Sequence, residues 1–232
     1  MVYEWSWRDR LLPGTCILCG AASGQPRDLC IPCTDELPWN KQSCPRCAMP
    51  IPGSQPGICG RCLSQPPRFA ASVAALRYTY PVRELVSRFK FDADLASGRL
   101  LSQLLVQHLI ARGAPEPGEF ALVPVPLHPE RRAERGFNQA ERIARVVARG
   151  LRQPLHEDLV ERIRQTPDQK KLSAAERRAN LRGAFRADSC TGLRVALVDD
   201  VLTTGATADA ISAILLAAGA SEVHVWCLAR AV

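Results

Sequence analysis

Residues 195–207 read VALVDDVLTTGAT, and this stretch decides the fold. Its first four residues are apolar and predict a short buried strand that ends abruptly at Asp199 and Asp200. A loop of small residues follows, and then a helix predicted from Thr207 to Ala218, with Gly219 as its C-terminal cap. In open α/β sheets, ligands bind in the crevice beyond the carboxyl ends of such strands.

The chemistry of this stretch suits a phosphorylated ligand. Backbone N–H groups of the loop and the positive end of the following helix attract a phosphate, and Gly205 lets the backbone approach it closely. The two carboxylates would then meet the neutral, hydroxyl-bearing part of the same ligand. The plainer alternative is an ordinary turn with a helix N-cap, which does not require all of these features together.

Strands alternate with helices after Gln65-Pro66-Pro67, which marks the predicted domain boundary. This alternation predicts an α/β fold with a largely parallel sheet flanked by helices. The helix predicted from Phe137 to Leu151 is amphipathic, with arginines on its outer face. The predicted strands are Ala70–Tyr80, Phe120–Pro126, Leu193–Val198 and Val223–Ala229; the other predicted helices are Val82–Phe91, Arg99–Arg112 and Ala174–Leu181, and Gln165–Lys171 is a predicted loop.

Eight of the ten cysteines form four Cys-x-x-Cys pairs before residue 63. Each such turn directs two thiolates at one point, which suits one edge of a tetrahedral zinc–sulfur site. Disulfides compete as an explanation, but they need an oxidising compartment. We predict two structural zinc sites, with an interleaved grouping of the pairs left open. The simpler, sequential grouping is Cys16, Cys19, Cys30 and Cys33 in one site and Cys44, Cys47, Cys59 and Cys62 in the other.

The composition, 47% hydrophobic and 23% charged residues, is that of a globular protein. No apolar stretch approaches the ~20 residues that cross a bilayer, and residues 1–12 lack the apolar core of a signal peptide. We therefore expect no membrane span and a cytoplasmic location. The net charge of +7 is concentrated in residues 131–186, where fifteen Lys and Arg outnumber seven Asp and Glu. This region suits an anionic partner, although a solvated helix face is the plain alternative.

Residues 195–207 resemble the phosphoribosyl pyrophosphate signature of type I phosphoribosyltransferases. The resemblance implies that Asp199 and Asp200 hold the ribose 2′- and 3′-hydroxyls. It also implies that magnesium is held largely by the ligand's own ribose and pyrophosphate oxygens, so no dedicated protein cage is expected. The residues that would cradle the 5′-phosphate are Thr203, Thr204, Gly205, Ala206 and Thr207.

The blocks VPVPLHP at 123–129 and RGFNQ at 135–139 resemble the ComF family of competence-associated, GntX-like proteins. The polar block at 169–180 and the four cysteine pairs resemble that family as well. The likeness covers essentially the whole chain. It implies a double zinc ribbon over residues 1–67 and a phosphoribosyltransferase-like domain over residues 68–232.

The two prolines of the VPVP block make its strand rigid. Arg131, Arg132 and Arg135 follow, and their guanidinium groups suit the pyrophosphate of the ligand; we take Arg135 as a candidate catalytic residue beside the two acids. The alternative is that these arginines are merely solvated. Three further features keep both a functional and a structural interpretation: His128 as an acid/base group, Asn138 and Gln139 as ligand contacts, and Lys170, Arg177 and Arg178 on a closing loop.

Three functional hypotheses follow. The chain could be a phosphoribosyltransferase that displaces pyrophosphate from C1 of the sugar, with an acceptor that the sequence does not reveal. Ammonia transfer from glutamine is not expected, because the early cysteines are assigned to zinc. The family resemblance implies instead that the chain handles single-stranded DNA beside the DNA-uptake machinery, and Arg145, Arg149 and Arg152 of the basic region suit electrostatic contacts with it. The third hypothesis is a catalytically inactive scaffold that senses the ligand.

Overall fold

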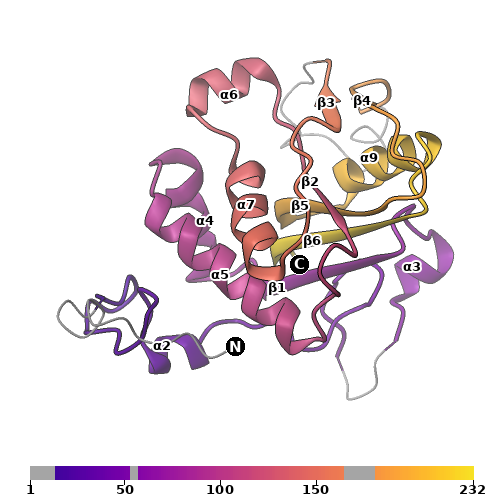
Figure 1. The fold of residues 1–232 in the computed structure, drawn as a ribbon. Coiled ribbons are helices and arrows are strands. Elements are labelled where there is room, and N and C mark those ends of the chain that lie inside the picture. Colours follow the sequence, from indigo (N-terminus) through magenta and orange to yellow (C-terminus); the bar gives the residue numbers. More distant parts are fainter. Residues whose placement is uncertain (1–13, 53–56, 165–180) are drawn as a thin grey trace.

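The computed structural model describes residues 14–52, 57–164 and 181–232. Its centre is a parallel four-stranded sheet in the order β1-β6-β5-β2, as Figure 1 shows. A separate antiparallel pair joins β3 (Val160–Arg162) to β4 (Phe185–Ala187). The four strands of the main sheet are β1 (Ala71–Arg77), β2 (Ala121–Pro124), β5 (Arg194–Leu202) and β6 (Glu222–Arg230).

Helices cover both faces of this sheet (Figure 1), so the predicted α/β fold is confirmed. Ala196 and Val198 of β5 face one core, with α4, α5 and α7, while Val195 and Leu197 face the other, with α9. This alternation is the period of two that a strand imposes on its side chains. The helices are α2 (Ile31–Asp35), α3 (Gly60–Ser64), α4 (Val82–Phe91), α5 (Leu95–Ala111), α6 (Pro129–Arg135), α7 (Gln139–Leu151) and α9 (Ala206–Ala217).

Several boundaries differ from the sequence prediction. Strand β5 does not end at Val198 but continues to Leu202, because it stays paired with β6 over its whole length. Helix α5 begins at Leu95, where the Asp94 side chain accepts hydrogen bonds from two backbone N–H groups. Helix α6, which begins at Pro129, was not predicted from the sequence. The loop and helix predicted within 165–180 lie outside the described residues, as do Lys170, Arg177 and Arg178.

The cysteine-rich segment packs against the sheet domain along much of its length. Its first part contacts α5, where Asp28 pairs with Arg99 at 2.6 Å. Its middle part lies along β1: the Ala75 carbonyl accepts a hydrogen bond from the Asn40 N–H, and Trp39 forms an antiparallel bridge with Leu76. The division at residue 67 into two domains stays a prediction. Within the described residues, no helix combines the length and apolarity needed to cross a membrane.

Candidate phosphate-binding site and metal centres

Asp199 and Asp200 lie inside β5, near the carboxyl edge of the sheet, and both are half-buried. The Asp199 Oδ1 accepts a hydrogen bond from the Asp200 N–H at 2.8 Å. Lys90, in the last turn of α4, places its Nζ 2.8 Å from Asp200 Oδ2. Lys90 gives no signal in the sequence, because 110 positions separate it from Asp200 and only the fold brings them together.

The electrostatics of this cluster hold the pKa of Asp199 near neutral pH. Withdrawal from water and the charge of Asp200 raise the pKa of Asp199 to about 7, although Lys90 and a backbone N–H oppose the shift. Burial disfavours the charged form of Lys90, but the Asp200 carboxylate outweighs it and raises the pKa of the lysine. Perturbed carboxyl groups of this kind gather at functional sites.

We expect Asp199→Asn to stabilise the fold more at pH 8 than at pH 5.5. The folded-state pKa of Asp199 lies above its ordinary value of 3.8, so the folded protein binds the extra proton and loses stability as pH rises from about 4 to 7. Asparagine removes this cost, and its advantage should grow by about 2 kcal/mol between the two pH values. Urea unfolding of both proteins at both pH values measures this difference. The exposed Asp158→Asn serves as the control, and an advantage that does not change with pH would contradict the charge argument.

The loop after β5 leads directly into α9. Gly205 has a φ of +80°, a left-handed conformation that suits glycine, and it is the residue before the first turn of the helix. The Thr204 Oγ1 accepts a hydrogen bond from the Ala206 N–H at 3.3 Å, while Thr203 is exposed and Thr207 half-exposed. The loop thus presents hydroxyls and backbone groups at the start of a twelve-residue helix.

The three candidate arginines lie on α6, which follows the carboxyl end of β2. Arg132 pairs with Glu141 at 2.6 Å. Arg135 donates to the Gln139 side chain and stacks on the exposed Phe91 ring at 5.4 Å. Arg131 lies on the same helix, half-exposed. In this structure, Arg132 and Arg135 are therefore engaged with the protein itself and are not merely solvated.

Two residues with open interpretations have structural contacts. The His128 Nδ1 accepts from the Glu130 N–H and caps α6. Asn138 caps α7, and its amide also donates to the Val125 carbonyl at 3.0 Å. These contacts fix α6 and α7 beyond the end of β2. Gln139 is buried, and its Nε2 has no hydrogen-bond partner among the described residues.

The eight paired cysteines form two clusters in the sequential grouping. Within each cluster, the four cysteine Sγ atoms all lie within 4.8 Å of one another. The Cys19–Cys30 and Cys47–Cys59 Sγ distances are 3.7 and 3.6 Å, which suit neighbouring ligands of one tetrahedral ion. The donors fit zinc, and the two clusters are zinc-ribbon-type sites, each with four cysteine ligands.

Backbone N–H groups favour the thiolate form in both clusters. Burial opposes ionisation of Cys16, yet N–H groups around it lower its pKa to about 6. Burial likewise opposes ionisation of Cys44, and N–H groups, including that of Cys59, lower its pKa to about 7. Each cluster therefore contains a thiol that ionises readily, as metal binding requires.

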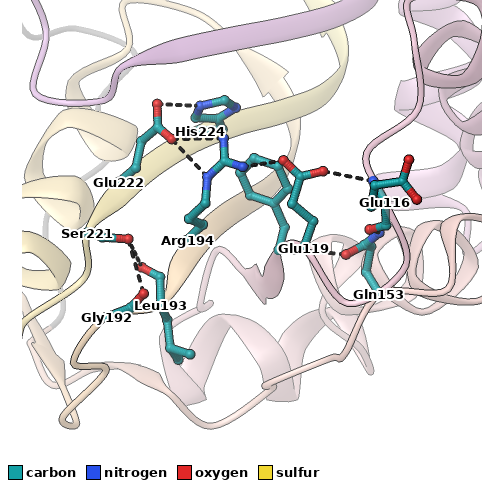
Figure 2. Close-up of polar contacts among 10 residues, drawn as sticks. Glu116, Glu119, Gln153, Gly192, Leu193, Arg194, Ser221, Glu222 and His224 are labelled. Atoms are coloured by element: carbon teal, nitrogen blue, oxygen red, sulfur yellow. Dashed lines mark hydrogen bonds and ion pairs between the residues drawn. The ribbon is translucent and has the colours of Figure 1, made fainter.

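A polar network at the opposite, amino-terminal edge of the sheet aligns the strands. Figure 2 shows Arg194 of β5 between Glu119, which precedes β2, and Glu222 of β6. The guanidinium also lies 4.5 Å from the centre of the Phe120 ring, and His224 contacts Glu222 at 3.0 Å. This network ties three adjacent strands together at their starts.

The comparisons with known proteins agree with this arrangement. The double zinc ribbon domain family matches residues 7–63. The chain is 37% identical to the DNA utilization protein YhgH of Salmonella typhi, over 94% of this chain and 98% of that protein. It is 39% identical to Competence protein F of Haemophilus influenzae, over 75% and 78% of the two chains. It is 29% identical to Competence protein ComFC of Streptococcus pneumoniae, over 68% and 67%. Together with the two cysteine clusters and the parallel sheet that follows them along the chain, these similarities show that the chain belongs to the ComF family.

Proposed function

We propose that this protein binds phosphoribosyl pyrophosphate with Mg²⁺ at the carboxyl edge of the sheet. One observation carries the proposal: Asp199 and Asp200, of which Asp200 pairs with Lys90, precede the loop that starts α9. Carboxylates suit sugar hydroxyls, and a loop at a helix start suits a phosphate. Along the chain the carboxylates come first and the loop second, so the sugar and the phosphate of one ligand would each have their own binding group.

Each part of the site has a role in this proposal. Asp199 and Asp200 accept hydrogen bonds from the ribose 2′- and 3′-hydroxyls, and residues 203–207 bind the 5′-phosphate. Lys90 limits the repulsion between the acids and the ligand, because it already neutralises one carboxylate. The magnesium ion would be bound through ribose and pyrophosphate oxygens of the ligand.

The α6 arginines face the pyrophosphate in this proposal. Arg131, Arg132 and Arg135 would stabilise the charge that develops on pyrophosphate as it leaves C1 of the sugar. Arg132 would first exchange its contact with Glu141 for the ligand. A phosphoribosyltransferase reaction follows if an acceptor nucleophile takes the place of pyrophosphate at C1.

The direct test incubates the purified protein with phosphoribosyl pyrophosphate, Mg²⁺ and a metabolite extract, and follows pyrophosphate release. Calorimetry with the ligand and Mg²⁺ alone measures binding separately from turnover. Binding together with extract-dependent release supports an enzyme. Binding without release supports a ligand-sensing scaffold, and the absence of binding contradicts the site itself.

We further propose that the protein acts in the cytoplasm on single-stranded DNA, beside the proteins of DNA uptake. Relatives of this chain carry the names DNA utilization protein and Competence protein F. The basic excess of residues 131–186 supports electrostatic binding. Arg142, Arg149 and Arg152 project from α7 and its C-terminal cap and are exposed. Arg145 is less suited than the sequence suggests, because it pairs with Glu157 at 2.6 Å.

The DNA proposal predicts a change in salt dependence. Arg142→Gln, Arg149→Gln and Arg152→Asn together should reduce the slope of log affinity against log salt by up to about 2, since each phosphate contact on a single strand contributes about 0.7. Asparagine is chosen at residue 152 because its φ is +53°. Fluorescence anisotropy titrations with an oligonucleotide at several salt concentrations measure the slope.

The control variant loses the same number of positive charges, but from helices outside the proposed DNA-binding face. Arg83→Gln, Arg88→Gln and Arg99→Gln remove three positive charges from α4 and α5, where each arginine already pairs with an acid. An equal slope in the α7 variant and the unmodified protein would exclude α7 as the DNA-binding face. Equal reductions in both variants would show only the effect of net charge.

A further inference from the structure

Arg230 joins the second cysteine cluster to the proposed phosphate loop. It ends β6 at the carboxyl edge of the sheet, yet it is only 2% exposed. Its Nε donates to the Cys47 carbonyl at 2.9 Å. Its Nη1 donates to the Leu202 carbonyl at 2.8 Å and also to the carbonyls of Thr203 and Ala231. One buried side chain therefore contacts both a metal-binding turn and the end of β5.

The burial of this guanidinium calls for a counter-charge. Burial lowers the pKa of Arg230, but a guanidinium remains charged in proteins, and an uncompensated buried charge is strongly unfavourable. The four acceptors are neutral carbonyls. A zinc ion with four thiolates carries a net charge of −2, and Cys47 belongs to that set of four. With zinc bound, the second site would supply a compensating negative charge beside Arg230.

The other turn of the same cluster also reaches the loop. Arg61 lies in α3 between the ligands Cys59 and Cys62, and its Nη2 donates to the Thr204 carbonyl at 2.8 Å. A cavity of about 90 Å³ separates this ribbon from the loop, with Arg61 and Arg230 in its lining. The two arginines therefore bridge a gap that close packing does not fill.

These contacts orient the backbone that a phosphate would meet. In a planar trans peptide unit, the C=O and the following N–H point in opposite directions. The carbonyls of Leu202 and Thr203 are held toward Arg230 at the end of β6, and the carbonyl of Thr204 is held toward Arg61 of the ribbon. The next N–H groups, those of Thr203, Thr204 and Gly205, consequently point away from these two arginines. Hydrogen bonds from both arginines to these carbonyls would be lost if the loop turned over.

We propose that Arg230 and Arg61 are positioning residues through which zinc in the second ribbon organises the phosphate loop, so that zinc and phosphoribosyl pyrophosphate strengthen each other's binding. This inference rests on the proposed function, because it assigns the loop to the 5′-phosphate. Such coupling must be reciprocal: the ligand strengthens zinc binding at the second site by the factor by which zinc strengthens ligand binding.

The first test uses Arg61→Ala, because Arg61 lies on the protein surface and its loss should not unfold the domain. Its matched control is Arg99→Ala, which breaks the contact of the first ribbon with α5, away from the loop. Arg61→Ala should weaken phosphoribosyl pyrophosphate binding by about 3- to 10-fold, and Arg99→Ala should leave it unchanged. Arg230→Met should have a larger effect, about 10- to 100-fold, with Arg230→Lys between them.

The second test does not depend on the ligand. Amide hydrogen exchange of residues 203–207 should accelerate in Arg61→Ala and when a chelator removes zinc from the unmodified protein. Zinc transfer to a coloured chelator should be less complete when phosphoribosyl pyrophosphate and Mg²⁺ are present. Unchanged exchange after zinc removal would overturn the coupling. Accelerated exchange in a protein that never binds the ligand would uphold the organisation of the loop by zinc and reject both the proposed function and the coupling to the ligand.

Discussion

Asp199→Asn combined with Asp200→Asn should weaken phosphoribosyl pyrophosphate binding by roughly two orders of magnitude while the domain stays folded. The physical reason is the loss of charge-assisted hydrogen bonds to two ribose hydroxyls, which contribute about 2–4 kcal/mol together. Asparagine matches the shape of aspartate, and both side chains are half-buried at the carboxyl end of β5, where β5 still pairs with β6. Calorimetry with Mg²⁺ at pH 8 measures the affinity.

A double control separates this effect from the general loss of two negative charges. Asp158→Asn with Asp188→Asn changes two exposed acids near β3 and β4 and should leave the affinity unchanged. Circular dichroism should show the same secondary structure in all three proteins. If the Asp199 and Asp200 double variant is folded and binds with unchanged affinity, the ribose assignment is wrong.

Cys44→Ser should reduce the zinc content from about two ions per chain to about one and unfold the second ribbon. The ribbon's own buried cluster consists of the ligands Cys44, Cys47 and Cys62, with Met49 and Ile51 packed against them, while Ala48 packs into a core of the sheet domain. Such a small apolar cluster cannot replace the metal as a source of folding free energy. Elemental analysis measures the zinc, and limited proteolysis detects cleavage within residues 41–64.

The matched control is Cys190→Ser, which removes a buried thiol that belongs to neither cluster. It should keep both zinc ions and the protease resistance of the ribbon. Two zinc ions in Cys44→Ser, or none in the unmodified protein purified without chelators, would contradict the assignment of the second site.

The sequence could predict those parts of the protein whose signals are local. The Cys-x-x-Cys pairs, the apolar strand before Asp199 and the glycine ahead of α9 each depend on neighbours within a few positions. Side-chain pairing across the fold gives no such signal. Lys90 ends an ordinary amphipathic helix, and Arg230 closes an apolar strand near the end of the sequence, where an arginine suggests solvent exposure.

The extension of β5 beyond Val198 has the same origin. Asp199 and Asp200 look like a break in an apolar strand, and strands usually exclude such residues. The ladder to β6 continues regardless, because Asp199 pairs with Cys227 and Leu202 with Arg230. Pairing with a neighbouring strand therefore outweighed local propensity at the carboxyl edge of the sheet, where the proposed site lies.

The antiparallel contact along β1 also bears on the solubility of the protein. β1 is an outer strand, and an uncovered outer strand offers a row of free backbone groups to the sheet of another molecule. Residues 38–40 occupy that row through contacts with Ala75, Leu76 and Arg77. Since this covering segment lies between the two cysteine clusters, zinc starvation would uncover β1 and favour intermolecular β-pairing. The ribbons would then make the solubility of this protein depend on zinc.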